Sequence, residues 1–255
     1  MIQENQGDAA TVRALVENLQ SEGHIVHLIR LEKGADAPVP FGLPGDAPLV
    51  CHGPGFVTRA LHHPRLSRGL FFDPAAFRWS AFRAAWGDAM LARDGNVMTL
   101  AGALERLRGQ PAFVRPDADS KAFDGAVLDR EGLLRAALSI NHATSVVLAR
   151  PMAIEAEWRF FIVAREVAAC SEYRRWGRPS VDGAVPHAAI ELAAELAMRW
   201  SPAEVYCLDL AAAENRVGVI EANCFNASRF YAADMRRILQ AVNAHVLARH
   251  ARAGS

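Results

Sequence analysis

Three oxygen-bearing side chains at the ends of two apolar runs have the composition of a divalent-metal site. Asp209 lies near the end of one run, and Glu221 and Asn223 end the next. Because successive side chains of a strand point to opposite faces, Glu221 and Asn223 share one face. The polar residues 214–216 predict a hairpin turn that brings Asp209 alongside Glu221. Two carboxylates and an amide oxygen suit Mg²⁺, and acidic residues that end strands by chance explain these residues equally well.

A second segment has the residues of a phosphate-binding loop. A strand over residues 113–116 carries Arg115 near its end, and the loop that follows contains Lys121 and Gly125. Arginine offers a planar fork for phosphate oxygens, lysine adds a mobile charge, and the backbone N–H groups around Ser120 suit the remaining oxygens. The alternative is a solvated hairpin turn in which Arg115 and Lys121 pair with aspartates of the same loop.

A third segment, residues 154–163, is predicted to be a strand with one charged face. Glu157, Arg159 and Phe161 share this face, and the opposite face is apolar and aromatic. An arginine among such neighbours is seldom buried without an anionic partner. That partner is either a ligand or a protein carboxylate, and Glu157 on the same face is one candidate.

Together and in this order, these motifs resemble those of the ATP-grasp superfamily. The resemblance is to a compact clade with arginine where the superfamily usually has lysine, at a strand-end Lys-Pro step. It runs from about residue 77 to residue 241. The residues that carry it are Arg115-Pro116, the loop 120–125, residues 157–161, Ser171-Glu172-Tyr173, Leu208-Asp209, residues 221–223, Asn226 and Tyr231.

The resemblance implies an α+β fold in which two α+β subdomains grip ATP. A small α/β domain, Rossmann-like and of the pre-ATP-grasp type, is expected before it. We expect this N-terminal domain over residues 1–75 and the ATP-grasp domain over residues 76–255. The first subdomain is expected over about residues 76–147 and the second over residues 148–255.

Local patterns predict the elements of these domains. An apolar face at helical spacing predicts a helix over residues 11–22, and strands are expected at 24–31 and 49–53. Further helices are expected over residues 100–108, 131–138, 186–200 and 231–251. The aromatic residues Phe77, Phe82 and Trp86 are expected in the core.

The resemblance also implies a role for each candidate residue. Arg115 and Lys121 resemble phosphate ligands, and Arg159 resembles the cation that faces the transferred phosphoryl group, so that Arg159 and Lys121 are the implied catalytic pair. Asp209, Glu221 and Asn223 resemble the Mg²⁺ ligands, through which Asp209 also belongs to the ATP site.

Two further segments complete this assignment. The hinge that meets adenine is expected at residues 146–151, with Leu148, Ala149 and Arg150, and Glu157 resembles the residue near the ribose. A basic group in the N-terminal domain is expected to line the acceptor side of the cleft: Arg59, His62, His63, Arg65 and Arg68.

The implied activity is that of an ATP- and Mg²⁺-dependent carboxylate–amine ligase. A carboxylate attacks the γ-phosphate, an acylphosphate forms, and an amine displaces phosphate to leave an amide. The expected substrates are small-molecule or peptide carboxylates and amines. The alternatives are a small-molecule kinase, a nucleotide-binding protein without catalysis and a plain interaction module. Either Arg159→Ala or Glu221→Ala is expected to abolish ATP turnover and leave the fold intact.

Composition favours a soluble, cytoplasmic protein. The 255 residues include 28 basic and 28 acidic side chains, so no net charge recruits nucleic acid or an anionic membrane. The four cysteines lie far apart, as expected of reduced thiols. There is no signal peptide and no apolar stretch long enough to span a bilayer. The apolar helix at residues 188–200 is expected either inside the monomer or across a homodimer.

Overall fold

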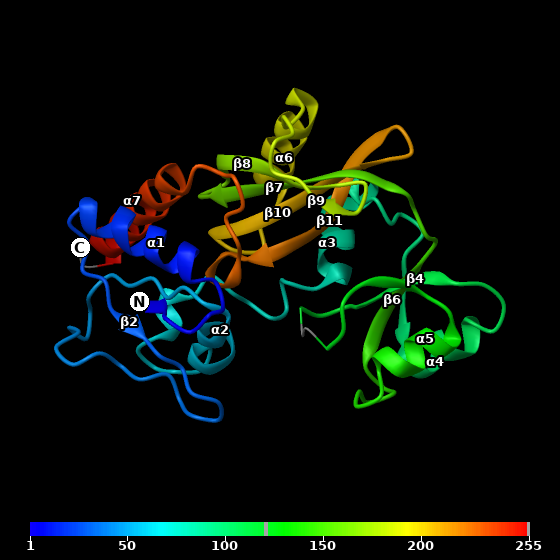
Figure 1. The fold of residues 1–255 in the computed structure, drawn as a ribbon, viewed down its shortest axis with the longest axis horizontal. Helices are drawn as coiled ribbons and strands as arrows, with labels where there is room; N and C mark the ends of the chain where they lie inside the picture. The colour runs from blue at the N-terminus through cyan, green and yellow to red at the C-terminus, as the bar shows by residue number, and fades with distance from the viewer. Residues whose placement is uncertain (120–121, 254–255) are drawn as a thin grey trace.

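The computed structural model describes residues 1–119 and 122–253. A five-stranded sheet occupies its centre (Figure 1). At one end lie the N-terminal segment and the C-terminal helix, and at the other end lies a four-stranded sheet with two helices. Among the described residues, no helix is both long and apolar enough to cross a membrane.

The five-stranded sheet is antiparallel throughout, in the order β11-β10-β7-β8-β9. Its strands are β7 (Ile154–Val163), β8 (Glu166–Arg175), β9 (Arg178–Pro179), β10 (Val205–Ala213) and β11 (Arg216–Cys224). The hairpin predicted from the two apolar runs is β10–β11. Its turn is made by Glu214 and Asn215, both with positive φ, as a two-residue hairpin loop requires.

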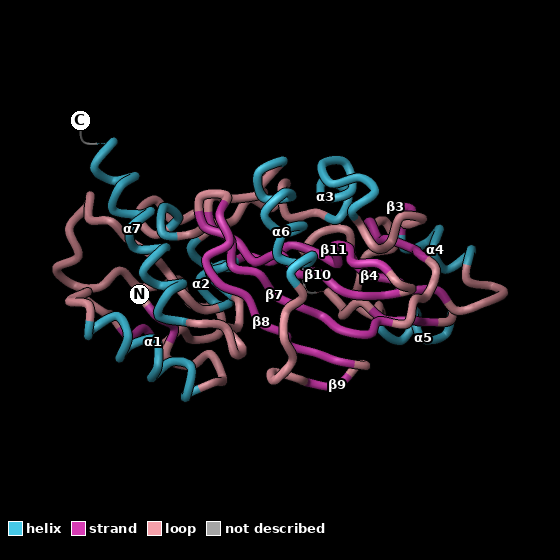
Figure 2. The backbone as a smooth tube through the Cα atoms, turned by 90° about the horizontal axis from the view of Figure 1, so that it is seen from above, coloured by secondary structure: helices cyan, strands magenta, loops and turns pink. Residues whose placement is uncertain are grey.

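Two helices cover one face of this sheet, α3 (Trp79–Trp86) and α6 (His187–Arg199), and both lie on the same side of it in Figure 2. Phe82 and Trp86 of α3 pack in a core with Trp158 and Phe160 of β7. The indole nitrogen of Trp86 donates to the Leu196 carbonyl at 3.2 Å. The expected burial of Phe77, Phe82 and Trp86 is therefore confirmed.

The opposite face is covered over only part of its length. Phe161 and Val163 of β7 pack under α7 (Met235–Ala253) and α1 (Ala9–Ser21), in a core shared with Phe225 and Phe230. The short 3-10 helix η3 (Phe225–Ala227) connects β11 to this region. Glu157 and Arg159 lie further along the same face, and both line a cavity there.

The four-stranded sheet has the order β3-β6-β4-β5 and is also antiparallel. Its strands are β3 (Asn96–Thr99), β4 (Ala112–Pro116), β5 (Ala126–Leu128) and β6 (Ser145–Ala149), and its helices are α4 (Leu100–Arg106) and α5 (Arg130–Ala136). Both helices begin at a side-chain cap, Thr99 for α4 and Asp129 for α5. The domain boundaries stay a prediction, and α3 packs against the five-stranded sheet rather than this one.

The N-terminal segment has shorter strands than expected. It contains β1 (Ile2–Gln3), β2 (Leu28–Ile29), α2 (Pro54–Ala60) and η1 (Ser67–Gly69). The strand expected at 24–31 shrinks to β2, because its partner β1 is only two residues long. The strand expected at 49–53 was wrong, since only His52 forms a bridge, to Ile2.

Asn226 explains the missing strand. Its side chain donates to the carbonyls of Cys51 at 2.6 Å and Gly69 at 2.9 Å and accepts from Phe71 N–H at 2.7 Å. Its backbone carbonyl accepts from Gly53 N–H. One fully buried amide therefore satisfies the polar groups that a longer strand would otherwise pair. Asn226 thereby ties η3 to the N-terminal segment.

Two helix starts differ from expectation for local reasons. Helix α1 begins at Ala9 because Asp8 accepts from the backbone N–H groups of Ala10 and Thr11. Helix α7 begins at Met235 and not at residue 231, because Tyr231 has φ +51°, which a right-handed helix excludes. The Asp234 side chain then accepts from Arg237 N–H at 3.0 Å.

His52 is a buried histidine beside η3. Its ring stacks on Phe230 with centroids 5.4 Å apart and meets Phe225 edge-on at 5.7 Å. Neither ring nitrogen has a hydrogen-bond partner among the described residues. Burial lowers the pKa of His52 to about 4, and the charge of the N-terminal ammonium adds to the shift.

We expect acid to destabilise the protein as this imidazole is forced to protonate. The folded-state pKa lies below the ordinary value, so the neutral ring's contribution is present at neutral pH and is lost as pH falls toward 4. The loss is about 3 kcal/mol over this range. In urea denaturation at a series of pH values, the free energy of unfolding of His52→Leu should fall less than that of the wild type. Equal falls would contradict this assignment.

Candidate active site

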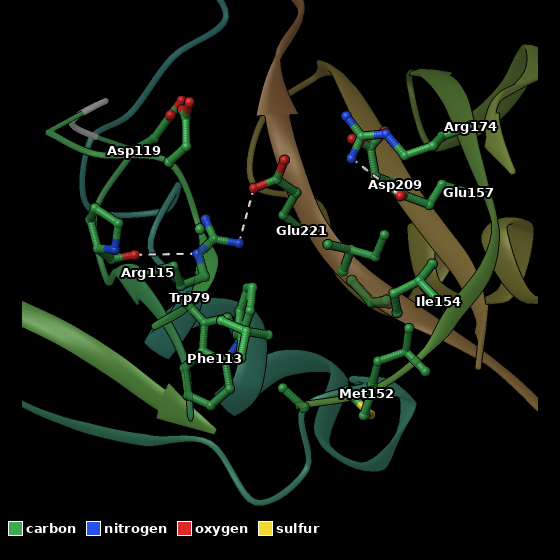
Figure 3. Close-up of a pocket in the computed structure, with 18 of the residues that line it drawn as sticks. Trp79, Phe113, Arg115, Asp119, Met152, Ile154, Glu157, Arg174, Asp209 and Glu221 are labelled. Carbon is green, nitrogen blue, oxygen red and sulfur yellow. Dashed lines mark hydrogen bonds and ion pairs between the residues drawn. The ribbon is translucent and has the colours of Figure 1, made fainter. Parts of the chain in front are cut away.

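A cavity of about 410 Å³ lies between the two larger sheets. One end is apolar and is lined by Leu91, Phe113, Met152, Ile154 and Ile220. The other end is charged, with Arg115 on one wall and Glu221, Asp209, Glu157 and Arg174 on the other (Figure 3). The cavity therefore offers an apolar slot that leads into a cluster of ionised groups.

The three predicted metal ligands converge at the charged end. Asp209 of β10 stands opposite Glu221 of β11, and Cys207 stands opposite Asn223. The Asn223 amide nitrogen donates to Asp209 Oδ2 at 3.0 Å and to Glu221 Oε1 at 2.9 Å. Among the described residues, no cluster of three or more His, Cys, Asp and Glu side chains suits a metal, so this set has only two carboxylates.

Arg159 and Asp209 form a buried two-point ion pair. Arg159 Nε and Nη2 donate to the two carboxylate oxygens at 2.8 and 2.7 Å, from opposed positions on β7 and β10. Burial raises the pKa of the Asp209 carboxyl, and the Arg159 charge limits that rise. Burial alone would lower the pKa of Arg159, but Asp209 raises it well above its ordinary value. The partner of Arg159 is thus a protein carboxylate, and it is not Glu157.

Arg115 reaches across the cavity. Its Nη1 lies 2.9 Å from Glu221 Oε2, and both side chains are mostly buried. Asp117, a loop aspartate considered as a partner for Arg115, instead accepts from Ser80 N–H at 2.8 Å at the start of α3. Asp117 thus anchors the loop to α3.

The other residues predicted for the phosphate loop are divided. Asp119, Phe123, Asp124 and Gly125 line the cavity. A Cβ at Gly125 would lie 3.1 Å from the Phe113 ring, so the glycine allows close approach of the loop to β4. The roles predicted for Lys121 and for the backbone at Ser120 lie outside the described residues.

The predicted adenine hinge is partly displaced. Arg150 lines the cavity, but its backbone N–H donates to Asp94 at 2.9 Å and its guanidinium pairs with Glu214. Leu148 and Ala149 pack in the cores of the two sheets and are not among the cavity-lining residues. The hinge residues on the cavity are Met152 and Ile154, which follow it in the chain.

Glu157, predicted near the ribose, is held by two residues of β8. It accepts from the Tyr173 hydroxyl at 2.7 Å and pairs with Arg174 at 3.3 Å. Burial raises the pKa of Tyr173, as do the nearby carboxylates of Asp209 and Glu157. Sequence reasoning assigned no role to Arg174, because alternation would turn either Tyr173 or Arg174 away. A β-bulge at Tyr173 brings both to the cavity, since Glu157 pairs with Arg174 and Trp158 with Glu172.

Tyr231 completes the charged end. Its ring stacks on Tyr173 with centroids 5.0 Å apart and lies 5.2 Å from the Arg159 guanidinium carbon. The positive φ of Tyr231 directs the chain over Arg159 before α7 begins. Such strain in a non-glycine residue is typical of functional sites.

The basic group expected on the acceptor side does not line this cavity. Arg65 donates to the Leu43 carbonyl, and Arg68 donates to the Pro44 carbonyl at 3.4 Å. His63 Nδ1 accepts from the backbone N–H groups of Arg65 and Leu66. These side chains therefore hold the loop at residues 34–48 in place.

Comparison with known proteins identifies the family. A family model of the ATP-grasp domain, the second family of one clade of that domain, matches residues 91–241, more than half of the chain. The chain therefore belongs to the ATP-grasp family, and its α+β fold is the ATP-grasp fold. A search among curated proteins found no match.

Solved structures share this fold at low sequence identity. A RimK domain ATP-grasp protein from Sphaerobacter thermophilus is 16% identical, with a TM-score of 0.64 over 96% of this chain and 98% of its own. D-alanine–D-alanine ligase from Bacillus anthracis is 12% identical, with a TM-score of 0.62 over 98% and 97%. The ATP-grasp ligase PsnB, solved with a minimal precursor, Mg and ADP, is 13% identical, with a TM-score of 0.57 over 96% of each chain. These identities support the fold alone.

The charged end fits a magnesium-bound polyphosphate by the chemistry of its donors. Asp209, Glu221 and Asn223 supply hard oxygens, and the amide of Asn223 already lies within hydrogen-bond distance of both carboxylates. Arg115 supplies a guanidinium for phosphate oxygens from the facing wall. The apolar end suits a planar base, because its lining is aliphatic and aromatic.

Proposed function

We propose that this protein is an ATP- and Mg²⁺-dependent ligase that joins a carboxylate to an amine through an acylphosphate. The observation that carries the proposal is the single cavity with an apolar slot at one end and converging carboxylates and arginines at the other. A nucleoside triphosphate has the same division into base and phosphates. Membership of the ATP-grasp family and the ligases among the structural neighbours support the same interpretation.

The residues of the charged end divide the work between them. Bound Mg²⁺ would neutralise oxygens of the β- and γ-phosphates, with Asp209, Glu221 and Asn223 as its ligands. Arg115 would hold the phosphates from the facing wall. Arg159 is fixed by Asp209 and by the Tyr173–Tyr231 stack, so its charge is preorganised for the transferred group.

Arg174 is the more adjustable cation. Its side chain is about half exposed, and its contact with Glu157 is 3.3 Å long. It can therefore turn toward an acid substrate with little loss of protein contacts. We assign Arg174 to the substrate carboxylate or the acylphosphate, beside the more rigid Arg159.

The function is tested by the fate of the substrate oxygens. Acids and amines, including amino acids in pairs, are screened for phosphate release with ATP and Mg²⁺. For a positive pair, an ¹⁸O-labelled carboxylate should pass one labelled oxygen to phosphate, because the acylphosphate breaks at its acyl carbon. Mass spectrometry should show the amide. A stable phosphorylated product would indicate a kinase instead, and nucleotide binding without any product would contradict the ligase.

A further inference from the structure

Each carboxylate of the proposed metal site already has a cationic partner from the protein. Asp209 is paired with Arg159 at 2.7 and 2.8 Å, and Glu221 is paired with Arg115 at 2.9 Å. These arginines come from different sheets, β7 and β4, on different walls of the cavity (Figure 3). A metal ion must therefore compete with two guanidinium groups for the same oxygens.

The third ligand is also turned toward the carboxylates by its donor side. The Asn223 amide nitrogen bonds to both acids, at 3.0 and 2.9 Å, and this group cannot coordinate a cation. Rotation of the amide by half a turn would present its oxygen. That rotation gives up two hydrogen bonds, which a cation between the carboxylates would have to replace.

Charge balance shows what could replace these contacts. Glu157, Asp209 and Glu221 face Arg115, Arg159 and Arg174, so the charges of these side chains cancel as folded. A divalent cation added alone would lie beside guanidinium groups with no compensating charge. A polyphosphate added with it would offer Arg115 new oxygens and free Glu221 for the metal.

We propose that Arg115 couples metal binding to nucleotide binding, by holding Glu221 until phosphate oxygens take its place. The inference rests on the proposed ATP site and specifies how that site fills. A divalent cation alone binds weakly, and a cation with a nucleoside polyphosphate binds well. Linkage makes the effect reciprocal, so the nucleotide also needs the cation.

Arg115→Met tests this, because it removes the charge and keeps a long side chain. Manganese is the probe, with the signal of free Mn²⁺ followed by electron paramagnetic resonance in the absence of nucleotide. We expect Arg115→Met to bind Mn²⁺ alone at least about tenfold more tightly than the wild type. Arg115→Lys keeps the charge and should resemble the wild type. Arg135→Met removes an arginine from the exposed surface of α5, paired with Glu131, and controls for net charge.

Calorimetric titration with ADP, with and without Mn²⁺, completes the test. The wild type should bind ADP tightly only with Mn²⁺, and Arg115→Met should weaken this binding. If Arg115→Met binds Mn²⁺ alone no better than the wild type, the coupling role is refuted, while ADP binding keeps the ATP site itself. If the wild type binds no ADP under either condition, the proposed function fails with it. Should Arg115→Met not fold, as judged by circular dichroism, Arg115→Gln is measured in the same way.

Discussion

In a Glu221→Gln variant, we expect ATP turnover to fall by roughly two to three orders of magnitude. The substitution keeps the shape of the side chain and removes the charge that would hold the divalent cation. It also frees Arg115, whose guanidinium lies 2.9 Å from Glu221. Because Glu221 is partly exposed, solvent screens this pair and the thermal midpoint should change little. Phosphate release and a thermal melt measure the two effects.

Glu214→Gln is the matched control. Glu214 lies in the turn of the same β10–β11 hairpin and pairs with Arg150 at the surface. The control removes the same charge from the same hairpin, away from the phosphate end of the cavity. Its turnover should stay close to that of the wild type. Normal turnover in Glu221→Gln would refute the metal-ligand role, and equal losses in both variants would point to a general effect of charge.

The sequence predicts the two hairpin strands well because strand alternation is a strong constraint when one face is buried. Ala222 packs in the core beneath the sheet, which leaves Glu221 and Asn223 on the cavity side. The same logic placed Glu157 and Arg159 on one face of β7. The polar turn at residues 214–216 then set the register that puts Asp209 opposite Glu221.

The irregularities at the site were beyond this reasoning. β-Bulges at Ile220 and Tyr173 let two consecutive residues line the cavity, so Ile220 joins Glu221 and Arg174 joins Tyr173. An alternating pattern contains no signal for an inserted residue. The partners of Arg159 and Arg115 also come from strands about 50 and 100 residues away, and only the sheet packing brings them together.

The N-terminal segment shows a different limit. Its apolar runs predict strands, but the backbone groups of Cys51, Gly53 and Gly69 bond to Asn226 instead of a ladder. A single amide far along the chain thus decides the local structure. Asn226 was recognised as a family marker, and the structure adds that it joins the N-terminal segment to η3.

The Arg159–Asp209 pair changes the expectation that Arg159 can be removed with the fold intact. Asp209 is 1% exposed, so Arg159→Met would leave a buried carboxylate without its cation. We expect this variant to lose about 3–5 kcal/mol in its free energy of unfolding. Without Arg159, burial raises the pKa of Asp209 further. Stability is therefore regained as the pH falls and the carboxyl is protonated, and the deficit should shrink toward acid pH.

The double variant Arg159→Met/Asp209→Asn separates stability from function. Removing both charges eliminates the unpaired ion, so more than half of the lost stability should return, as is found when buried ion pairs are replaced as a pair. Urea denaturation of the wild type and the two variants measures the recovery. Phosphate release should stay absent in both variants, because neither keeps the preorganised cation. A double variant as unstable as Arg159→Met would show that the arginine acts through packing, and a double variant with wild-type turnover would remove Arg159 and Asp209 from the mechanism.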